Sequence, residues 1–171
     1  SFADKVNQLN ISASFAWHKE VKPDWYFSFL TSANYNTADN PPYNLNRGIG
    51  YRRQFLRGYE VYVIEGPMYT MNKATFKRRI FSSEFDSGIP LQQFRRVPVA
   101  VYLKGYADLG YVQNYPAYEH LNLNTRLSDR WLGGAGFGLD IVTHYDSVIR
   151  LEYTFTTQQT SGFFLHIRKE F

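Results

Sequence analysis

Alternation of apolar and polar residues is the dominant pattern along the chain, and its period of two is that of a β-strand. From Leu9 to Trp17, apolar side chains occupy every second position, and Ser12 and Ser14 are among the polar residues between them. Six further segments carry the same pattern, at about 25–33, 69–81, 99–111, 134–141, 149–155 and 163–171. We find no helix-period segment of useful length. The sequence therefore predicts an all-β chain with seven clear strands, and an eighth only if residues 43–66 contain one.

The lengths of the predicted strands and of their connections favour a membrane barrel. Segments such as 69–81 and 99–111 exceed the roughly 5–6 residues of a typical globular strand, whereas a tilted membrane strand needs about 9–11. The connections at 19–24 and 144–147 are tight, and those at 36–66 and 113–131 are long. Short turns on one side and long loops on the other are typical of outer-membrane barrels. The 82–98 connection is longer than its short-turn side predicts, and it would place Arg95 and Arg96 at the periplasmic surface.

Composition agrees with this interpretation and excludes several others. Aromatic residues make up 18% of the 171 residues and charged residues 20%, and the mean hydropathy is −0.41. An aromatic chain of moderate hydropathy is expected when only one face of each strand meets lipid. No apolar run is long enough for a transmembrane helix, and the lack of cysteine excludes disulfides and cysteine chemistry. The formal charge of +4 fits anionic lipopolysaccharide or a charged lumen, and we expect no nucleic-acid partner.

Three local features carry a family resemblance. The first is Leu56-Arg57-Gly58-Tyr59, followed by Glu60, within the long 36–66 connection. The second is Asp108, which alternation places on the polar face of its strand and which is followed by Gly110. The third is the terminal strand, with an alternating series that ends on an aromatic residue: Phe163, Leu165, Ile167, Lys169 and Phe171. Together these features resemble the BamA/TamA outer-membrane assembly superfamily, the surface-antigen family.

The resemblance implies an antiparallel transmembrane β-barrel of which residues 1–171 are the C-terminal segment. Seven or eight strands would belong to a larger barrel of about 16, while the first strands and the polypeptide-transport-associated (POTRA) domains of the family are not in this sequence. Residues 36–66 would be extracellular loop six, which in the family folds into the lumen. Its Arg57 would pair with Asp108 on the inner wall. The family often has a glutamate on the strand after loop six, where this chain has Lys73, Thr75 and Lys77 instead.

The function implied is assembly, insertion or translocation of proteins at the Gram-negative outer membrane, by presenting a strand edge rather than by chemistry. The expected partners are lipid and lipopolysaccharide, unfolded outer-membrane proteins, periplasmic or lipoprotein subunits, and the remainder of the chain's own barrel. Neither enzyme activity nor a cofactor is expected. Two alternatives stay open: the barrel of a patatin-like phospholipase fusion, and a small structural or partner-docking barrel in the same membrane.

The remaining candidate residues favour structural roles. Lys104 and Arg150 are alternative lumenal partners for Asp108, and the glycines at 134, 136 and 138 would leave space for the inserted loop. Glu152 and Glu170 with Arg150 and Arg168 suggest a charge ladder between adjacent strands. The four histidines lack metal-ligand spacing, so no metal site is predicted. Lipid phosphate is the alternative ligand of two basic clusters, which comprise Arg47, Arg52 and Arg53, and Lys77, Arg78 and Arg79.

Overall fold

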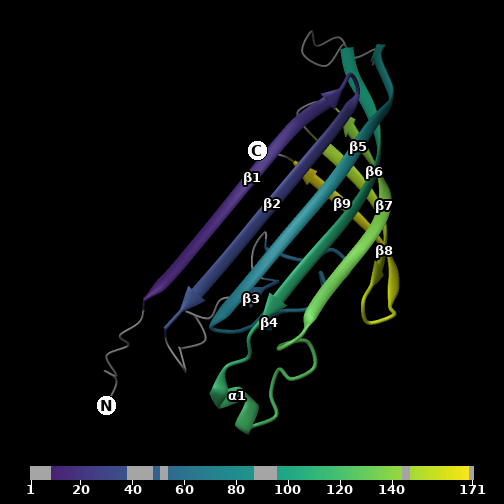
Figure 1. Ribbon diagram of the computed structural model, residues 1–171. Helices are drawn as coiled ribbons and strands as arrows, with labels where there is room; N and C mark the ends of the chain where they lie inside the picture. The colour runs from purple at the N-terminus through teal and green to yellow at the C-terminus, as the bar shows by residue number, and fades with distance from the viewer. Residues whose placement is uncertain (1–8, 38–47, 51–53, 87–95, 144–146, 170–171) are drawn as a thin grey trace, which may run out of the picture.

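The computed structural model describes residues 9–37, 48–50, 54–86, 96–143 and 147–169. One antiparallel sheet dominates the fold, and its seven strands lie side by side in chain order (Figure 1). These strands are β1 (Asn10–Lys22), β2 (Trp25–Asn36), β5 (Met68–Asp86), β6 (Arg96–Val112), β7 (Trp131–Thr143), β8 (Ser147–Thr156) and β9 (Ser161–Lys169). The prediction of a mainly antiparallel β chain with seven long strands is therefore confirmed. Within the described residues the sheet is not closed, because β1 and β9 lie at opposite edges of the strand order.

The long connection between β2 and β5 contains two short strands. β3 (Gly48–Ile49) pairs with β4 (Ile64–Glu65) in a separate two-stranded sheet. The segment that could have held an eighth strand of the main sheet thus forms a small sheet of its own. In Figure 1 β3 and β4 lie behind the lower half of the main sheet, near the end of β2 and the start of β5.

Three sequence predictions about the connections between strands need correction. The connection expected at 82–98 is shorter, because β5 continues to Asp86 and β6 begins at Arg96; Arg95 lies outside the described residues. Between β1 and β2 only Pro23 and Asp24 form the turn, and Asp24 has a φ of 69°. A five-residue helix, α1 (Pro116–His120), lies in the connection between β6 and β7, which was expected to be free of helix. In the described part of the chain, no helix has the length and apolar character needed to cross a membrane.

A β-bulge explains why the alternation in β5 is less clean than elsewhere. Up to Arg79, the odd positions face the polar side of the sheet. The register then shifts between Arg79 and Phe81, so that Phe81 lies opposite Val101 and Phe85 opposite Val97. An extra residue reverses the parity of the side chains. The bulge therefore keeps aromatic residues on the same apolar face along the full length of the strand.

The two faces of the sheet differ in character. The outward face is rich in exposed apolar side chains, of which Phe15, Trp17, Phe76, Leu103, Phe137, Phe155, Phe163 and Leu165 are examples. The described parts of the β2–β5 loop pack against the opposite face, and the buried apolar core lies there, between loop and sheet. Ile49, Leu56, Tyr59 and Ile64 come from the loop, and Tyr69, Met71, Val112, Leu127 and Leu132 come from elsewhere. The fold thus inverts the usual plan, since its larger apolar surface faces away from the core.

Candidate functional site

A tight turn in the β2–β5 loop presents the Leu56–Glu60 motif to the sheet. Leu56 and Tyr59 are fully buried in the core, and the backbone N–H of Tyr59 donates to the carbonyl of Leu56 at 3.0 Å. Gly58 has a φ of 87°, and a Cβ atom there would lie 2.6 Å from the Thr156 methyl and 2.9 Å from that of Thr154. Glycine is required both by this conformation and by the close approach to β8.

Arg57 and Asp108, which the sequence analysis pairs, are brought together by this turn. The Arg57 Nε donates to Asp108 Oδ2 at 2.9 Å, its Nη2 donates to Oδ1, and its backbone N–H donates to Oδ2 at 3.1 Å. Both residues are buried. A two-pronged arginine–carboxylate bond is stronger and more directional than a single hydrogen bond. Because separating the two buried charges would leave each of them without its partner, the pair fixes the loop against β6.

Further contacts of Arg57 extend the attachment to neighbouring strands. Its Nη2 donates to the carbonyl of Ala74 on β5 at 3.3 Å, and its guanidinium lies 4.0 Å from the centre of the Tyr106 ring. Glu152 on β8 places Oε1 3.9 Å from Nη1. A second carboxylate therefore does approach Arg57, but it comes from β8 and not from the strand that follows the loop.

Lys73 occupies the region of β5 where the resembled family often has an acidic residue, so the side chain there carries the opposite charge. Its Nζ donates to the carbonyl of Phe55 at 2.9 Å, lies 4.3 Å from the Phe55 ring centre and is 3.7 Å from Asp108 Oδ2. Lys73 thus anchors the loop backbone and adds a second positive charge beside Asp108. Lys104 and Arg150, the alternative partners considered for Asp108, contact other carboxylates.

A second group of ion pairs surrounds Asp140 on β7. Its carboxylate is 2.5 Å from Lys104 Nζ, 2.6 Å from Lys77 Nζ and 3.2 Å from Arg150 Nε. Lys104 also contacts Glu152 Oε1 at 2.7 Å, which joins this group to the Arg57 pair. Alternation predicts that all these residues share the inward face, but the position of Asp140 at the centre could not be read from the chain. Of the charge ladder expected between adjacent strands, Arg150 on β8 contacts Asp140 on β7, while Glu170 and the Arg168 side chain lie outside what the structure describes.

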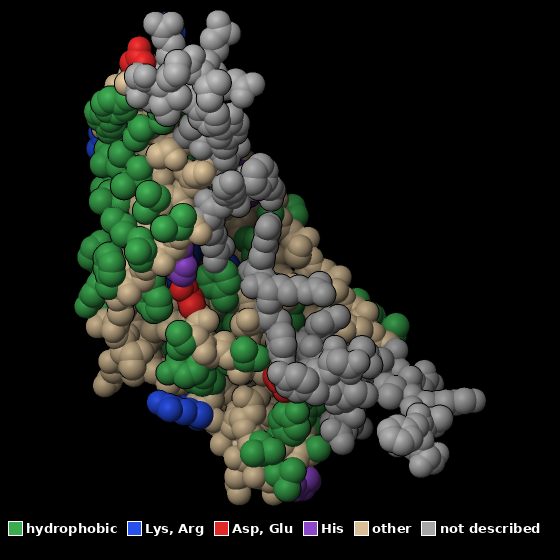
Figure 2. All heavy atoms as spheres, turned by 180° about the vertical axis from the view of Figure 1, so that it is seen from behind, with side chains coloured by type: hydrophobic (Ala, Val, Ile, Leu, Met, Phe, Trp, Pro, Cys, Tyr) green, Lys and Arg blue, Asp and Glu red, His purple; other side chains and the backbone are tan. Residues whose placement is uncertain are grey.

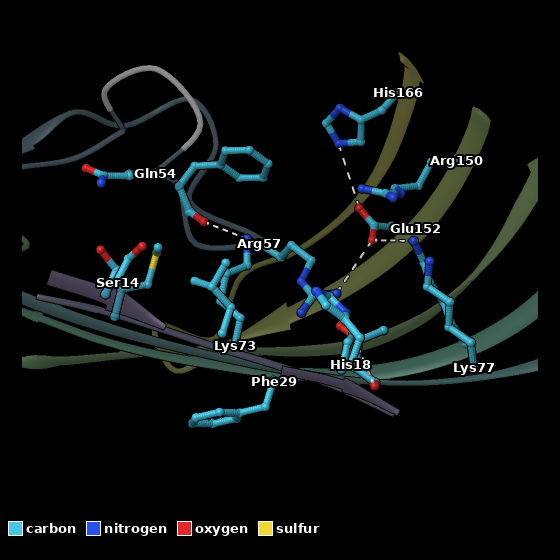
Figure 3. A pocket seen from close by; sticks show the side chains of 17 residues that line it. Ser14, His18, Phe29, Gln54, Arg57, Lys73, Lys77, Arg150, Glu152 and His166 are labelled. Carbon is cyan, nitrogen blue, oxygen red and sulfur yellow. Dashed lines mark hydrogen bonds and ion pairs between the residues drawn. The ribbon is translucent and has the colours of Figure 1, made fainter. Parts of the chain in front are cut away.

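A cavity of about 430 Å³ lies between the loop and the inner face of the sheet. Figure 3 shows the cationic side chains of Arg57, Lys73, Lys77 and Arg150 around it, with Glu152 and His166 at one end. Phe29 points to the other side of the strands. The described lining of the cavity is therefore polar and charged, and several of its charged side chains form ion pairs.

The glycines of β7 make room for this arrangement, and Gly134 makes room for the loop itself, as the sequence predicts. A Cβ atom on Gly134 would collide with the Arg57 carbonyl. On Gly136 it would lie 2.7 Å from the Tyr106 hydroxyl, and on Gly138 it would lie 3.1 Å from Cε of Lys104. The small residues thus let the loop and two long side chains lie directly against the strand.

The terminal strand is tied to the loop through Glu60. Its Oε2 lies 2.8 Å from Nε2 of His166 on β9, a contact that the sequence gives no reason to expect. Phe163, Leu165 and Ile167 point outward and are exposed, in the alternation predicted for them. Phe171 and Glu170 lie outside the described residues, as do Arg47, Arg52 and Arg53, and nothing is described of the Arg168 and Lys169 side chains. Of the second basic cluster, Lys77 pairs with Asp140, Arg79 pairs with Asp24, and Arg78 lies over the Trp25 ring.

The connection between β6 and β7 braces the base of the loop. Asn124 Nδ2 donates to the Glu65 carbonyl at 2.7 Å, and the Tyr118 hydroxyl donates to Glu65 Oε2 at 3.4 Å. Tyr115 is buried beside them, and burial, aided by the negative charge of Glu65, raises the pKa of its phenol to about 12. Tyr115 therefore remains neutral at physiological pH.

Comparison with known proteins found no matching family model, no matching curated protein and no matching solved structure.

Proposed function

We propose that the chain is the C-terminal part of an outer-membrane β-barrel of the BamA/TamA type, acting in the assembly, insertion or translocation of proteins without catalysing a reaction. The observation that carries the proposal is the loop held on the polar face by the buried Arg57–Asp108 pair, behind a sheet whose other face is apolar. This combination suits a strand wall between lipid and a charged lumen.

Strand length supports a membrane location. β1, β2 and β7 have 13, 12 and 13 residues, and about 9–11 tilted residues cross a bilayer. In lipid, backbone groups must be paired within the protein, so an open sheet needs further strands. We assign the outer edges of β1 and β9 to contacts with the remaining strands of the same barrel, with β9 as one side of its seam.

The proposed activity follows from that seam. A nascent barrel strand cannot leave its N–H and C=O groups unpaired in hydrocarbon, and an exposed strand edge offers temporary pairing by strand addition. Unfolded outer-membrane proteins would pair with β9 in this way. The loop would hold the strands rigid from inside, through the contact of Arg57 with Asp108 on β6 and that of Glu60 with His166 on β9. Lipid and lipopolysaccharide would contact the outward face, and periplasmic or lipoprotein subunits would act as partners.

The experiment uses the lack of natural cysteine in this sequence. A single cysteine replaces Leu165 on β9, and a substrate barrel carries single cysteines along its terminal strand. During substrate assembly in outer-membrane vesicles, disulfides should form with substrate positions spaced by two, because successive residues point to opposite faces. Depletion of the protein should also reduce the amount of folded barrel proteins in the membrane.

Gly105→Cys is the matched control. Gly105 is also exposed on the outward face, but its strand β6 is paired on both sides and a Cβ there meets no atom within 4 Å. Cross-linking at position 105 as strong as at 165, or a chain that is recovered in the aqueous fraction without detergent, would contradict the proposal.

A partner-docking barrel is the second candidate function, and the β5–β6 hairpin favours it. β2 pairs with β5 only as far as Arg78, and β7 pairs with β6 only as far as Ala100. Beyond Ser82 and its partner Ala100 the hairpin projects alone, with Phe85 exposed. Normal levels of folded barrel proteins after depletion, together with loss of one membrane complex, would favour this second function.

A further inference from the structure

Three side chains that commonly bind metal ions meet on the inner face of the sheet, although they come from separate parts of the chain. Glu60 belongs to the loop, Glu152 to β8 and His166 to β9. One ligand atom of each lies within 4.8 Å of the others. Nε2 of His166 is 2.8 Å from Glu60 Oε2 and 3.8 Å from Glu152 Oε2. Ligands of a tetrahedral ion with bonds of about 2.0–2.1 Å are separated by similar distances.

The two oxygens of Glu152 serve different neighbours, and this leaves one of them directed at the cluster. Oε1 lies 2.7 Å from Lys104 Nζ and 3.9 Å from Arg57 Nη1, whereas Oε2 faces His166. The cations therefore hold the carboxylate in place from one side. Figure 3 shows His166 directed toward Glu152, with a dashed line that marks their contact.

The site is reachable from the hollow side of the sheet. Glu152 and His166 line the cavity, and the side chains of Glu60 and His166 are 11% and 21% exposed. In Figure 2, histidine and acidic atoms are visible together on this face, beside hydrophobic side chains. An ion can thus enter from the cavity and keep water as a further ligand.

The donor set selects a class of metal. One imidazole nitrogen and two carboxylate oxygens suit Zn²⁺ and its first-row neighbours, whereas Mg²⁺ and Ca²⁺ prefer oxygen alone. Without metal, the Glu60–His166 contact accounts for the short distance between them. Binding would displace the proton from Nε2, as it does whenever a ligand must be deprotonated.

We propose that Glu60, Glu152 and His166 bind a divalent transition ion of the zinc class, which joins the loop to the last two strands. The histidine spacing gave no expectation of this site, because its ligands are separated along the chain and only folding unites them. The inference is independent of the proposed function, since it requires only the geometry of the loop on β8 and β9.

The test is the titration of ZnCl₂ into the purified, untagged chain in detergent, followed by calorimetry and by elemental analysis after dialysis. We expect near-stoichiometric binding, and Co²⁺ in place of Zn²⁺ should give the visible absorption of a histidine-bound ion. His166→Gln and Glu60→Gln should each weaken binding by about 100-fold or more, because each removes a direct ligand and even supporting residues cost about 10–100-fold. Zinc should also raise the unfolding temperature of the wild-type chain but not that of His166→Gln.

His18→Gln is the matched control, since His18 lines the same cavity but is not one of the three ligands. It should bind zinc as the wild type does. The proposal is overturned if zinc does not bind, if His18→Gln loses as much affinity as His166→Gln, or if Mg²⁺ and Ca²⁺ compete equally with zinc. Glu60→Gln tests the site without disturbing the Lys104–Glu152 pair, so a folding defect in a Glu152 variant would not decide the result.

Discussion

At the scale of single residues, the Arg57–Asp108 pair is the most sensitive point of the structure. Arg57→Ala leaves the Asp108 carboxylate buried with Lys73 at 3.7 Å as its nearest remaining charge. We expect the free energy of unfolding to fall by about 3–5 kcal/mol, because removing one partner of a buried ion pair leaves the other charge buried and poorly compensated. Arg57→Lys keeps the charge but loses the two-pronged bond, and should cost about 1–3 kcal/mol. Urea denaturation in detergent, monitored by tryptophan fluorescence, measures both.

Arg96→Ala is the control for this series. Arg96 is exposed and lies 4.0 Å from Glu84, which is also exposed, so its removal should hardly change stability. Equal losses for Arg57→Ala and Arg96→Ala would show that Arg57 does not hold the loop. The simple exchange Arg57→Asp with Asp108→Arg should fail to restore stability, because an arginine at 108 would face Lys73.

Gly134 offers a second residue-scale prediction. Gly134→Ala places a methyl group against the Arg57 carbonyl and should displace the loop, at a cost of about 1–3 kcal/mol. Gly105→Ala adds the same atom to the sheet where nothing lies within 4 Å, and should be neutral or slightly stabilising. Protease sensitivity of the loop in the two variants checks the difference. If the loop of Gly134→Ala were as protected as that of Gly105→Ala, the close packing would be wrong.

At this scale the sequence predicts which residues belong to the site better than it predicts which of them contact one another. Alternation places Asp108, Asp140, Glu152 and Lys104 on one face, and a motif singles out Arg57. The choice of partners depends on the stagger between strands and on the depth of the loop, and neither leaves a trace in a single sequence. Lys73 shows this well: its type suggested a missing acidic partner, yet its reach to the Phe55 carbonyl makes it a support for the loop.

At the scale of elements, strand identity was predictable because period-two patterning over long segments is a strong signal, while boundaries were not. β5 runs past the expected turn because the bulge beside Arg79 reverses the parity of its pattern, which makes the continuation resemble a loop. The pairing of β3 with β4 escaped prediction for a different reason. Two residues per strand are too few to show any periodicity.

The β5–β6 hairpin should exchange its amide hydrogens unevenly. Residues 83–86 of β5 and 96–99 of β6 lie beyond the last partners on β2 and β7, so they form a two-stranded ribbon with two free edges. Isolated two-stranded ribbons are only marginally stable. We expect these segments to exchange much faster than residues 69–78 and 103–112 in hydrogen–deuterium exchange by mass spectrometry. Equal protection in the purified chain would contradict the free ribbon, while protection that appears only with a membrane partner would identify its docking site.

At the scale of the whole molecule, the three tryptophans report on membrane position. Trp17 lies in the middle of β1, whereas Trp25 begins β2 and Trp131 begins β7. Aromatic residues at strand ends favour the membrane–water interface. If the sheet spans a bilayer, single-tryptophan variants should show deeper quenching by brominated lipids for Trp17 than for Trp25 and Trp131. Similar, weak quenching at all three positions would place the sheet outside the hydrocarbon region.

The attachment of the loop also has a consequence for the order of events in folding. Arg57 meets a partner 51 residues away, and Tyr59 bonds to Thr157 at a separation of 98 residues. Contacts that are so distant along the chain form late, because the intervening segments must first be ordered. The loop can therefore dock only after β6, β8 and β9 have formed, so its docking follows the assembly of these strands into the sheet. A chain in which β9 has not yet paired would keep the Arg57 side chain exposed to water. That exposure would distinguish an incompletely folded molecule from a folded one.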